Sequence, residues 1–141
     1  MTRAFRLIAP VPLENDIHAS VAAALDLLLM PPATWATYPA GHIQLPPQAA
    51  AKLTRVGLKR GWPDILILHQ SLYGIELKRP GGKLSRTRIV RTRRGAPRIL
   101  EGQTEVFPRL IAAGMEIATC ESVDQVLTQL HAWNIPLRVH S

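Results

Sequence analysis

Two short apolar runs bordered by charged residues constrain this chain more than any other feature. The first run, Ile65 to Leu68, is aliphatic throughout and directly follows Asp64. The second, Gly74 to Leu77, directly precedes Lys78. The connection between them, His69 to Tyr73, is short and mostly polar. We therefore expect the two runs to pair as a β-hairpin, with the first strand buried on both faces.

This hairpin would bring two carboxylates and a lysine together. Side chains alternate along a strand, so Glu76 and Lys78 should share a face while Leu77 points into the other layer. Asp64 would lie close to both, at the open end of the first strand. Two converging carboxylates make a hard, oxygen-only site suited to Mg²⁺, and Lys78 could orient the attacking water or stabilise an oxyanion. The pattern predicts metal-dependent phosphodiester chemistry, and the alternative is an ordinary hairpin with surface charges.

A strongly basic arm follows the hairpin. Seven cations and no acid lie between Lys83 and Arg98, and the other ten Lys and Arg residues equal the ten Asp and Glu residues in number. The net charge of +7 therefore resides in this arm. A turn signal at 94–97 predicts a β-hairpin or extended loop insertion over 83–100, with one guanidinium face.

Arginine at this density is typical of proteins that bind a phosphate backbone. A solvated face or an acidic protein partner is the alternative, and no amphipathic helix accompanies the arm to favour a membrane surface. The predicted nucleic-acid-binding residues are Lys83, Arg86, Arg88, Arg91, Arg93, Arg94, Arg98, Lys59 and Arg60.

The remaining segments read as a scaffold of helices and strands. We expect a helix at 14–30, a strand at 34–38, a helix from 46 or 47 to 56, a helix at 103–113, a strand at 115–120 and a last helix ending at Trp133. Pro108 predicts a kink in the third helix or a later start. Ser122 with Gln125 resembles a capping box for the last helix. This order predicts a single α/β domain over residues 1–141.

The charged residues also resemble a known family. Pro63-Asp64 followed by Glu76-Leu77-Lys78 is similar to the signature of the PD-(D/E)XK nucleases, and the wider run from Gly57 to Gly82 resembles the VRR-NUC branch, the virus-type replication and repair nuclease domain of phages and bacteria. The resemblance extends from Glu14 to about Trp133. The segment after Lys78 is longer and richer in arginine than in the family pattern.

The resemblance implies a restriction-endonuclease-like core, in which helices flank a central mixed β-sheet. It matches Glu14 to a glutamate on the first helix and Gln103 to a glutamine that opens the helix after the catalytic strands. The implied metal ligands are Asp64, Glu76, the Leu77 carbonyl and Glu14, the last directly or through water. Lys78 would act on the attacking water, and Gln103 would steady Lys78 or a phosphate.

The implied activity is a Mg²⁺-dependent or Mn²⁺-dependent, structure-selective DNA endonuclease. Stand-alone members of the family act as homodimers on four-way (Holliday) junctions, which places the expected role in DNA repair. The alternatives are a flap or linear-duplex endonuclease, or a non-catalytic basic nucleic-acid-binding module on the same fold. No nucleotide cofactor is expected, because Gly81-Gly82 lacks the Gly-Lys-Ser/Thr that would follow in a phosphate-binding loop.

Composition predicts the compartment. The single cysteine, Cys120, excludes an intramolecular disulfide and suits a reducing cytosol. No apolar run is long enough to span a bilayer, and the first residues lack the apolar core of a secretory signal. We therefore expect a cytoplasmic protein of a bacterium, or a phage protein acting in the host cytoplasm, with no membrane partner.

Overall fold

The computed structural model describes residues 13–39, 46–91 and 95–138. These residues form an α/β fold with four helices and six strands. In chain order the elements are α1 (Glu14–Leu28), β1 (Thr34–Thr37), α2 (Pro47–Arg55), β2 (Ile65–His69), β3 (Ser71–Leu77), β4 (Arg88–Val90), β5 (Arg98–Leu100), α3 (Gln103–Ala112), β6 (Glu116–Cys120) and α4 (Val123–Ala132).

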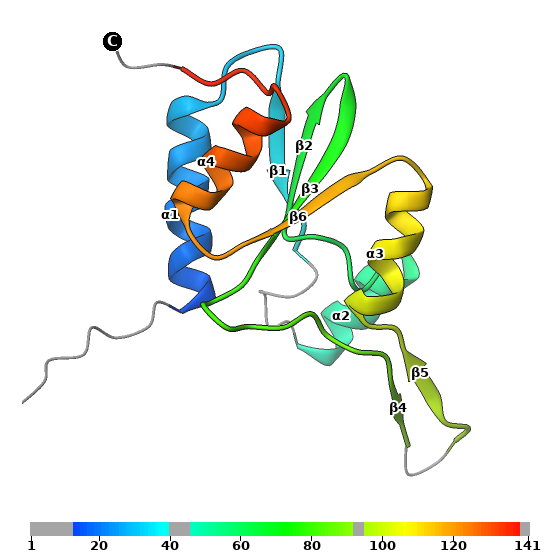
Figure 1. The fold of residues 1–141 in the computed structure, drawn as a ribbon. Coiled ribbons are helices and arrows are strands. Elements are labelled where there is room, and N and C mark those ends of the chain that lie inside the picture. The colour runs from blue at the N-terminus through cyan, green and yellow to red at the C-terminus, as the bar shows by residue number, and fades with distance from the viewer. Residues whose placement is uncertain (1–12, 40–45, 92–94, 139–141) are drawn as a thin grey trace, which may run out of the picture.

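The main sheet is mixed, which confirms the general α/β prediction. Its strand order is β1-β2-β3-β6, with antiparallel pairing from β1 to β3 and parallel pairing between β3 and β6. Strands β4 and β5 form a separate two-stranded sheet. Figure 1 shows α1 and α4 packed together on one side of the main sheet, with α2, α3 and the β4–β5 hairpin on the other side.

The hydrophobic core lies between the sheet and the α1–α4 pair. Val21 and Leu25 of α1 are fully buried there, and the alternate residues Ile75 and Leu77 of β3 belong to the same cluster. Because strand side chains alternate, Glu76 must point to the opposite face, toward α3. The burial of Ile75 and Leu77 therefore determines where the Glu76 carboxylate lies.

Two expectations about the hairpin are wrong. Ile65 and Ile67 are fully buried, but Leu68 is 54% exposed, because the α1–α4 pair covers only one face of β2. The second strand begins at Ser71, so Gln70 alone connects the strands, with a left-handed φ of 60°. Polar residues of the expected connection, such as His69 and Ser71, instead belong to the two paired strands. Their polar side chains give no indication of this backbone pairing.

The helix signals are mostly confirmed. Helix α1 ends at Leu28, two residues earlier than predicted, and α3 begins at Gln103 and continues through Pro108, so a later start is wrong. Half of the predicted capping box is confirmed: Gln125 N donates to Ser122 Oγ at 3.2 Å, but the Gln125 side chain accepts from Glu121 N, at 2.8 Å, and not from the N-cap residue Ser122. Within the described ranges, no helix combines the length and apolarity needed to cross a bilayer.

Candidate functional site

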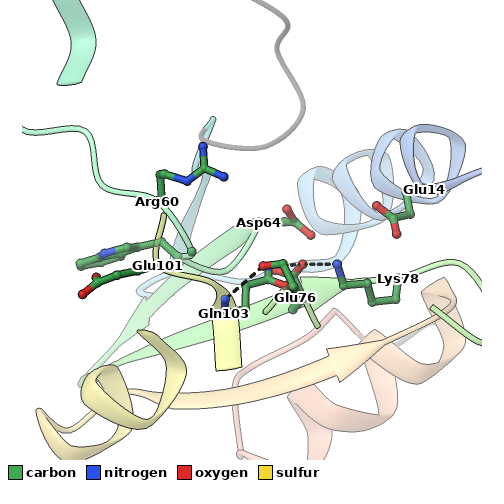
Figure 2. A pocket seen from close by; sticks show the side chains of 10 residues that line it. Glu14, Arg60, Asp64, Glu76, Lys78, Glu101 and Gln103 are labelled. Carbon is green, nitrogen blue, oxygen red and sulfur yellow. Dashed lines mark hydrogen bonds and ion pairs between the residues drawn. The ribbon is translucent and has the colours of Figure 1, made fainter. Parts of the chain in front are cut away.

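All five predicted catalytic residues and one predicted DNA-binding residue, Arg60, line one cleft of about 350 Å³, which we call the carboxylate cleft (Figure 2). The cleft lies at the ends of β2 and β3 and at the start of α3. Its lining residues are Glu14, Arg60, Gly61, Trp62, Asp64, Glu76, Lys78, Ser85, Glu101 and Gln103.

Asp64 is held by backbone contacts on both sides. Its carbonyl oxygen accepts a 2.8 Å hydrogen bond from Tyr38 N, beyond the end of β1. Its Oδ2 accepts a 2.8 Å hydrogen bond from Leu77 N, at the end of β3. The side chain is buried, and its carboxylate is thereby fixed beside the strand that carries Glu76.

Glu76 is the most deeply buried acid of the cleft, with 2% exposure. Its Oε1 accepts a 2.6 Å hydrogen bond from Gln103 Nε2 and lies 3.1 Å from Lys78 Nζ, as the dashed lines in Figure 2 show. Glu76 and Lys78 therefore share a face, as predicted. The resemblance implies that Gln103 steadies Lys78 or a phosphate, but its amide instead donates to Glu76.

The second oxygen of this carboxylate, Glu76 Oε2, is buried and has no hydrogen-bond partner among the described residues. Burying an anion without compensation is costly, because water no longer solvates the charge. Burial raises the pKa of Glu76 from 4.5 to about 7; the nearby Asp64 adds to the rise, while Gln103 and Lys78 oppose it. A cation between the two carboxylates would offset the lost hydration of Glu76 and its repulsion by Asp64.

The donor set fits Mg²⁺ or Mn²⁺ with two protein carboxylates. Within the ranges that the structure describes, no three His, Cys, Asp or Glu side chains gather as a metal-holding group. Glu14 lines the cleft from α1 without closing such a group with Asp64 and Glu76, so its role as a ligand stays a prediction, as does that of the Leu77 carbonyl. Mg²⁺ commonly takes one or two carboxylates and completes its shell with water and substrate phosphate.

A set of hydrogen bonds joins the base of the arm to the start of α3, and we call its residues the clasp. Ser85 N donates to Gln103 Oε1, and Gln103 N donates to Ser85 Oγ, both at 3.1 Å. Thr104 N donates to Ser85 O at 3.1 Å, and Gly102 N donates to Thr87 Oγ1 at 3.0 Å. The Gln103 amide thus connects the arm directly to Glu76.

Gly102 is required by the close approach of the two segments. A Cβ atom there would lie 2.5 Å from Ser85 O and 2.3 Å from Arg86 C, which are backbone atoms that cannot move aside cheaply. Sequence reasoning missed Ser85, Thr87 and Gly102. The available signals were a glycine just before a helix start and hydroxyl residues alternating with arginines.

The arm is a β-hairpin, as predicted. Opposite residues of an antiparallel pair share a face, so the register places Arg88 and Arg98 on one face and Ile89 and Ile99 on the other. The two isoleucines are 66% and 68% exposed. The hairpin therefore has an exposed apolar face in addition to the guanidinium face that was predicted.

The other predicted cations are exposed where the structure describes them: Lys83, Arg86, Arg91, Lys59 and Arg60. Arg60 also lines the carboxylate cleft. Arg93 and Arg94 lie outside the described residues.

Comparisons with protein families, curated proteins and solved structures find no match for this chain. The resemblance to the VRR-NUC nucleases therefore rests on the residues quoted above and stays a prediction.

The Glu76 pKa gives a test by protein stability. Between about pH 4.5 and 7 the unfolded chain loses the Glu76 proton while the folded protein retains it. Retention of this proton by the folded protein contributes to its stability. That contribution is fully present below pH 4.5 and is lost as pH rises through 7. In EDTA, the free energy of unfolding of Glu76→Gln, relative to that of the wild type, should therefore increase by about 1–3 kcal/mol from pH 5 to pH 8, as measured by urea unfolding. Glu116→Gln, at an exposed position of β6, is the control. If the free energies of unfolding of Glu76→Gln and the wild type differed by the same amount at pH 5 and pH 8, burial would not raise the pKa of Glu76.

The clasp gives a second test, by hydrogen exchange. Gly102→Ala should separate Ser85 from α3 and lower the free energy of unfolding by about 1–3 kcal/mol, because its Cβ overlaps backbone atoms. Amides from Ser85 to Val90 should exchange faster than in the wild type. Arg86→Ala, which changes only an exposed side chain of the arm, should leave exchange unchanged. Equal protection in Gly102→Ala and the wild type would show that the clasp does not hold the arm.

Proposed function

We propose that the protein is a divalent-metal-dependent, structure-selective DNA endonuclease of the VRR-NUC type, built on a PD-(D/E)XK core. The observation that carries the proposal is Glu76 Oε2, which is buried beside Asp64 in a cleft that also holds Lys78 and has no hydrogen-bond partner in the part of the chain that the structure describes. The mixed sheet supports the core assignment, because its central antiparallel pair, β2 and β3, carries Glu76 within β3 and is bordered by Asp64, directly before β2, and Lys78, directly after β3.

Asp64 and Glu76 would hold the ion, which, when bound, would lower the pKa of a coordinated water and neutralise charge on the phosphate. Gln103 has the supporting role that its contacts indicate. Its hydrogen bond to Glu76 Oε1 fixes the carboxylate and leaves Oε2 for the ion.

Lys78 would act on the nucleophile. Its side chain lines the cleft, is 13% exposed and brings its ammonium within 3.1 Å of Glu76 Oε1. A partly desolvated ammonium beside the carboxylates can orient the attacking water and stabilise the charge that develops on the phosphate oxygens. Replacing Lys78 should impair the hydrolytic step without removing either metal ligand.

DNA is the proposed substrate because exposed cations lie both at this cleft and on the arm. Arg60 lines the cleft wall, and the exposed Arg86, Arg88 and Arg98 lie on the arm that follows β3. Figure 1 shows the β4–β5 hairpin projecting away from the α1–α4 pair. A strand in the cleft could thus be held through its phosphates, which position DNA without reading its bases. A four-way junction needs two symmetric cuts, so a homodimer stays a prediction for that substrate.

The proposal predicts a separation of cleavage from binding. With Mg²⁺ or Mn²⁺, the wild type should cut members of a labelled panel of junction, flap and linear duplex DNA, and EDTA should stop cleavage. Asp64→Asn, Glu76→Gln and Lys78→Ala should each slow cleavage by about 10²- to 10³-fold or more. Affinity for the same DNA in EDTA should change little, because these residues hold the ion or act on the water.

Asp124→Asn, the same chemical change at an exposed position of α4, is the matched control and should cut normally. Metal-dependent cutting by Asp64→Asn at the wild-type rate would rule out the proposed ligand. A wild type that binds the panel but never cuts it would favour the non-catalytic binding module.

A further inference from the structure

A second cleft, of about 640 Å³, adjoins the carboxylate cleft. The two clefts share Arg60, Trp62 and Glu101 in their linings. The remaining lining residues of the second cleft are Thr54, Leu58, Lys59, Ile99, Val106, Arg109 and Leu110. A ligand could therefore extend from one cleft into the other past Trp62.

The second cleft combines apolar walls with cations. Leu58, Val106 and Leu110 line it together with Ile99, one of the hairpin's two exposed isoleucines. Lys59, Arg60 and Arg109 supply positive charge, while Glu101, the one acid among the described lining residues, pairs with Arg109. Such a lining suits a ligand that is planar and apolar at one end and anionic at the other.

Trp62 is fixed in place before any ligand binds. Its ring stacks on Tyr38 with centroids 5.3 Å apart and an interplanar angle of 19°. The Tyr38 hydroxyl donates to Lys59 O at 3.0 Å and accepts from Lys59 N at 2.9 Å. Gly61, with a φ of 81°, turns the chain directly before Trp62, where a Cβ would lie 2.8 Å from Val106 Cγ2. An aromatic ring held in this way loses little conformational entropy when a base stacks near it.

We propose that the second cleft binds an unpaired nucleotide of a DNA strand whose neighbouring phosphodiester lies in the carboxylate cleft. The base would lie against Trp62 and the apolar wall, and its phosphate would lie near Lys59 and Arg60. A base within a duplex has its faces stacked and its edge paired, so only an unpaired base offers the surface this lining fits. The inference rests on the proposed function and narrows its substrate to flaps, overhangs and junctions with unpaired nucleotides.

Binding in EDTA tests this inference without cleavage. Fluorescence anisotropy would compare labelled duplexes that carry a short thymidine overhang at either end with the blunt duplex of the same paired length. The wild type should bind at least one overhang duplex about tenfold or more tightly than the blunt one. Trp62→Phe should keep most of this preference, and Trp62→Leu should lose it.

The hairpin offers a matched pair of charge variants. Ile99 and Ile89 are directly opposed and similarly exposed, but only Ile99 lines the second cleft. Ile99→Glu should therefore remove the overhang preference, whereas Ile89→Glu should retain it. Both should weaken blunt-duplex binding equally, because each adds the same charge to the arm.

The outcomes separate this inference from the proposed function. Equal affinity of the wild type for blunt and overhang duplexes would overturn the inference even if both are cut. A preference that survives Ile99→Glu and Trp62→Leu would also overturn it, because the unpaired strand would then bind elsewhere. A Trp62-dependent preference in a protein that cuts no DNA would support the nucleotide site and contradict the nuclease assignment.

Discussion

A buried carboxylate needs cations or hydrogen-bond donors to offset its lost hydration, and Glu76 receives them on one oxygen only. Lys78 and Gln103 both contact Oε1, while Oε2 is buried without a partner among the described residues. Asp64 adds a second negative charge, which raises the pKa of Glu76 further. The divalent cation that we propose would offset both the lost hydration of Glu76 and its repulsion by Asp64.

The rest of the fold holds this carboxylate in position. Ile75 and Leu77 are anchored in the core, which directs Glu76 to the other face of β3. Gln103 reaches Glu76 from α3 and also accepts a hydrogen bond from Ser85 at the base of the arm. A single side chain, Gln103, therefore connects the arm, which we propose contacts DNA, to Glu76, which we propose binds the ion. Displacement of the arm would change the surroundings of Glu76 directly.

The sequence predicted those parts that depend on local periodicity. Strand alternation was enough to place Glu76 and Lys78 on one face, and the capping residues were enough to locate the start of α4. The clasp was not predictable, because it joins residues 18 apart through backbone atoms and a glycine. The Tyr38–Trp62 stack depends likewise on tertiary contacts. The early start of β3 was missed because backbone pairing includes polar residues such as Ser71, whose side chains carry no strand signal.

The most direct test of the account is to locate a bound Mn²⁺ ion by anomalous X-ray diffraction from crystals of the protein. We expect an anomalous peak between Asp64 and Glu76, about 2.0–2.3 Å from Glu76 Oε2, because no described residue donates a hydrogen bond to that oxygen. In Glu76→Gln crystals the peak should weaken or vanish. An ion bound only at other residues, or a site beside Asp64 and Glu76 that stays empty at saturating Mn²⁺, would contradict the central claim.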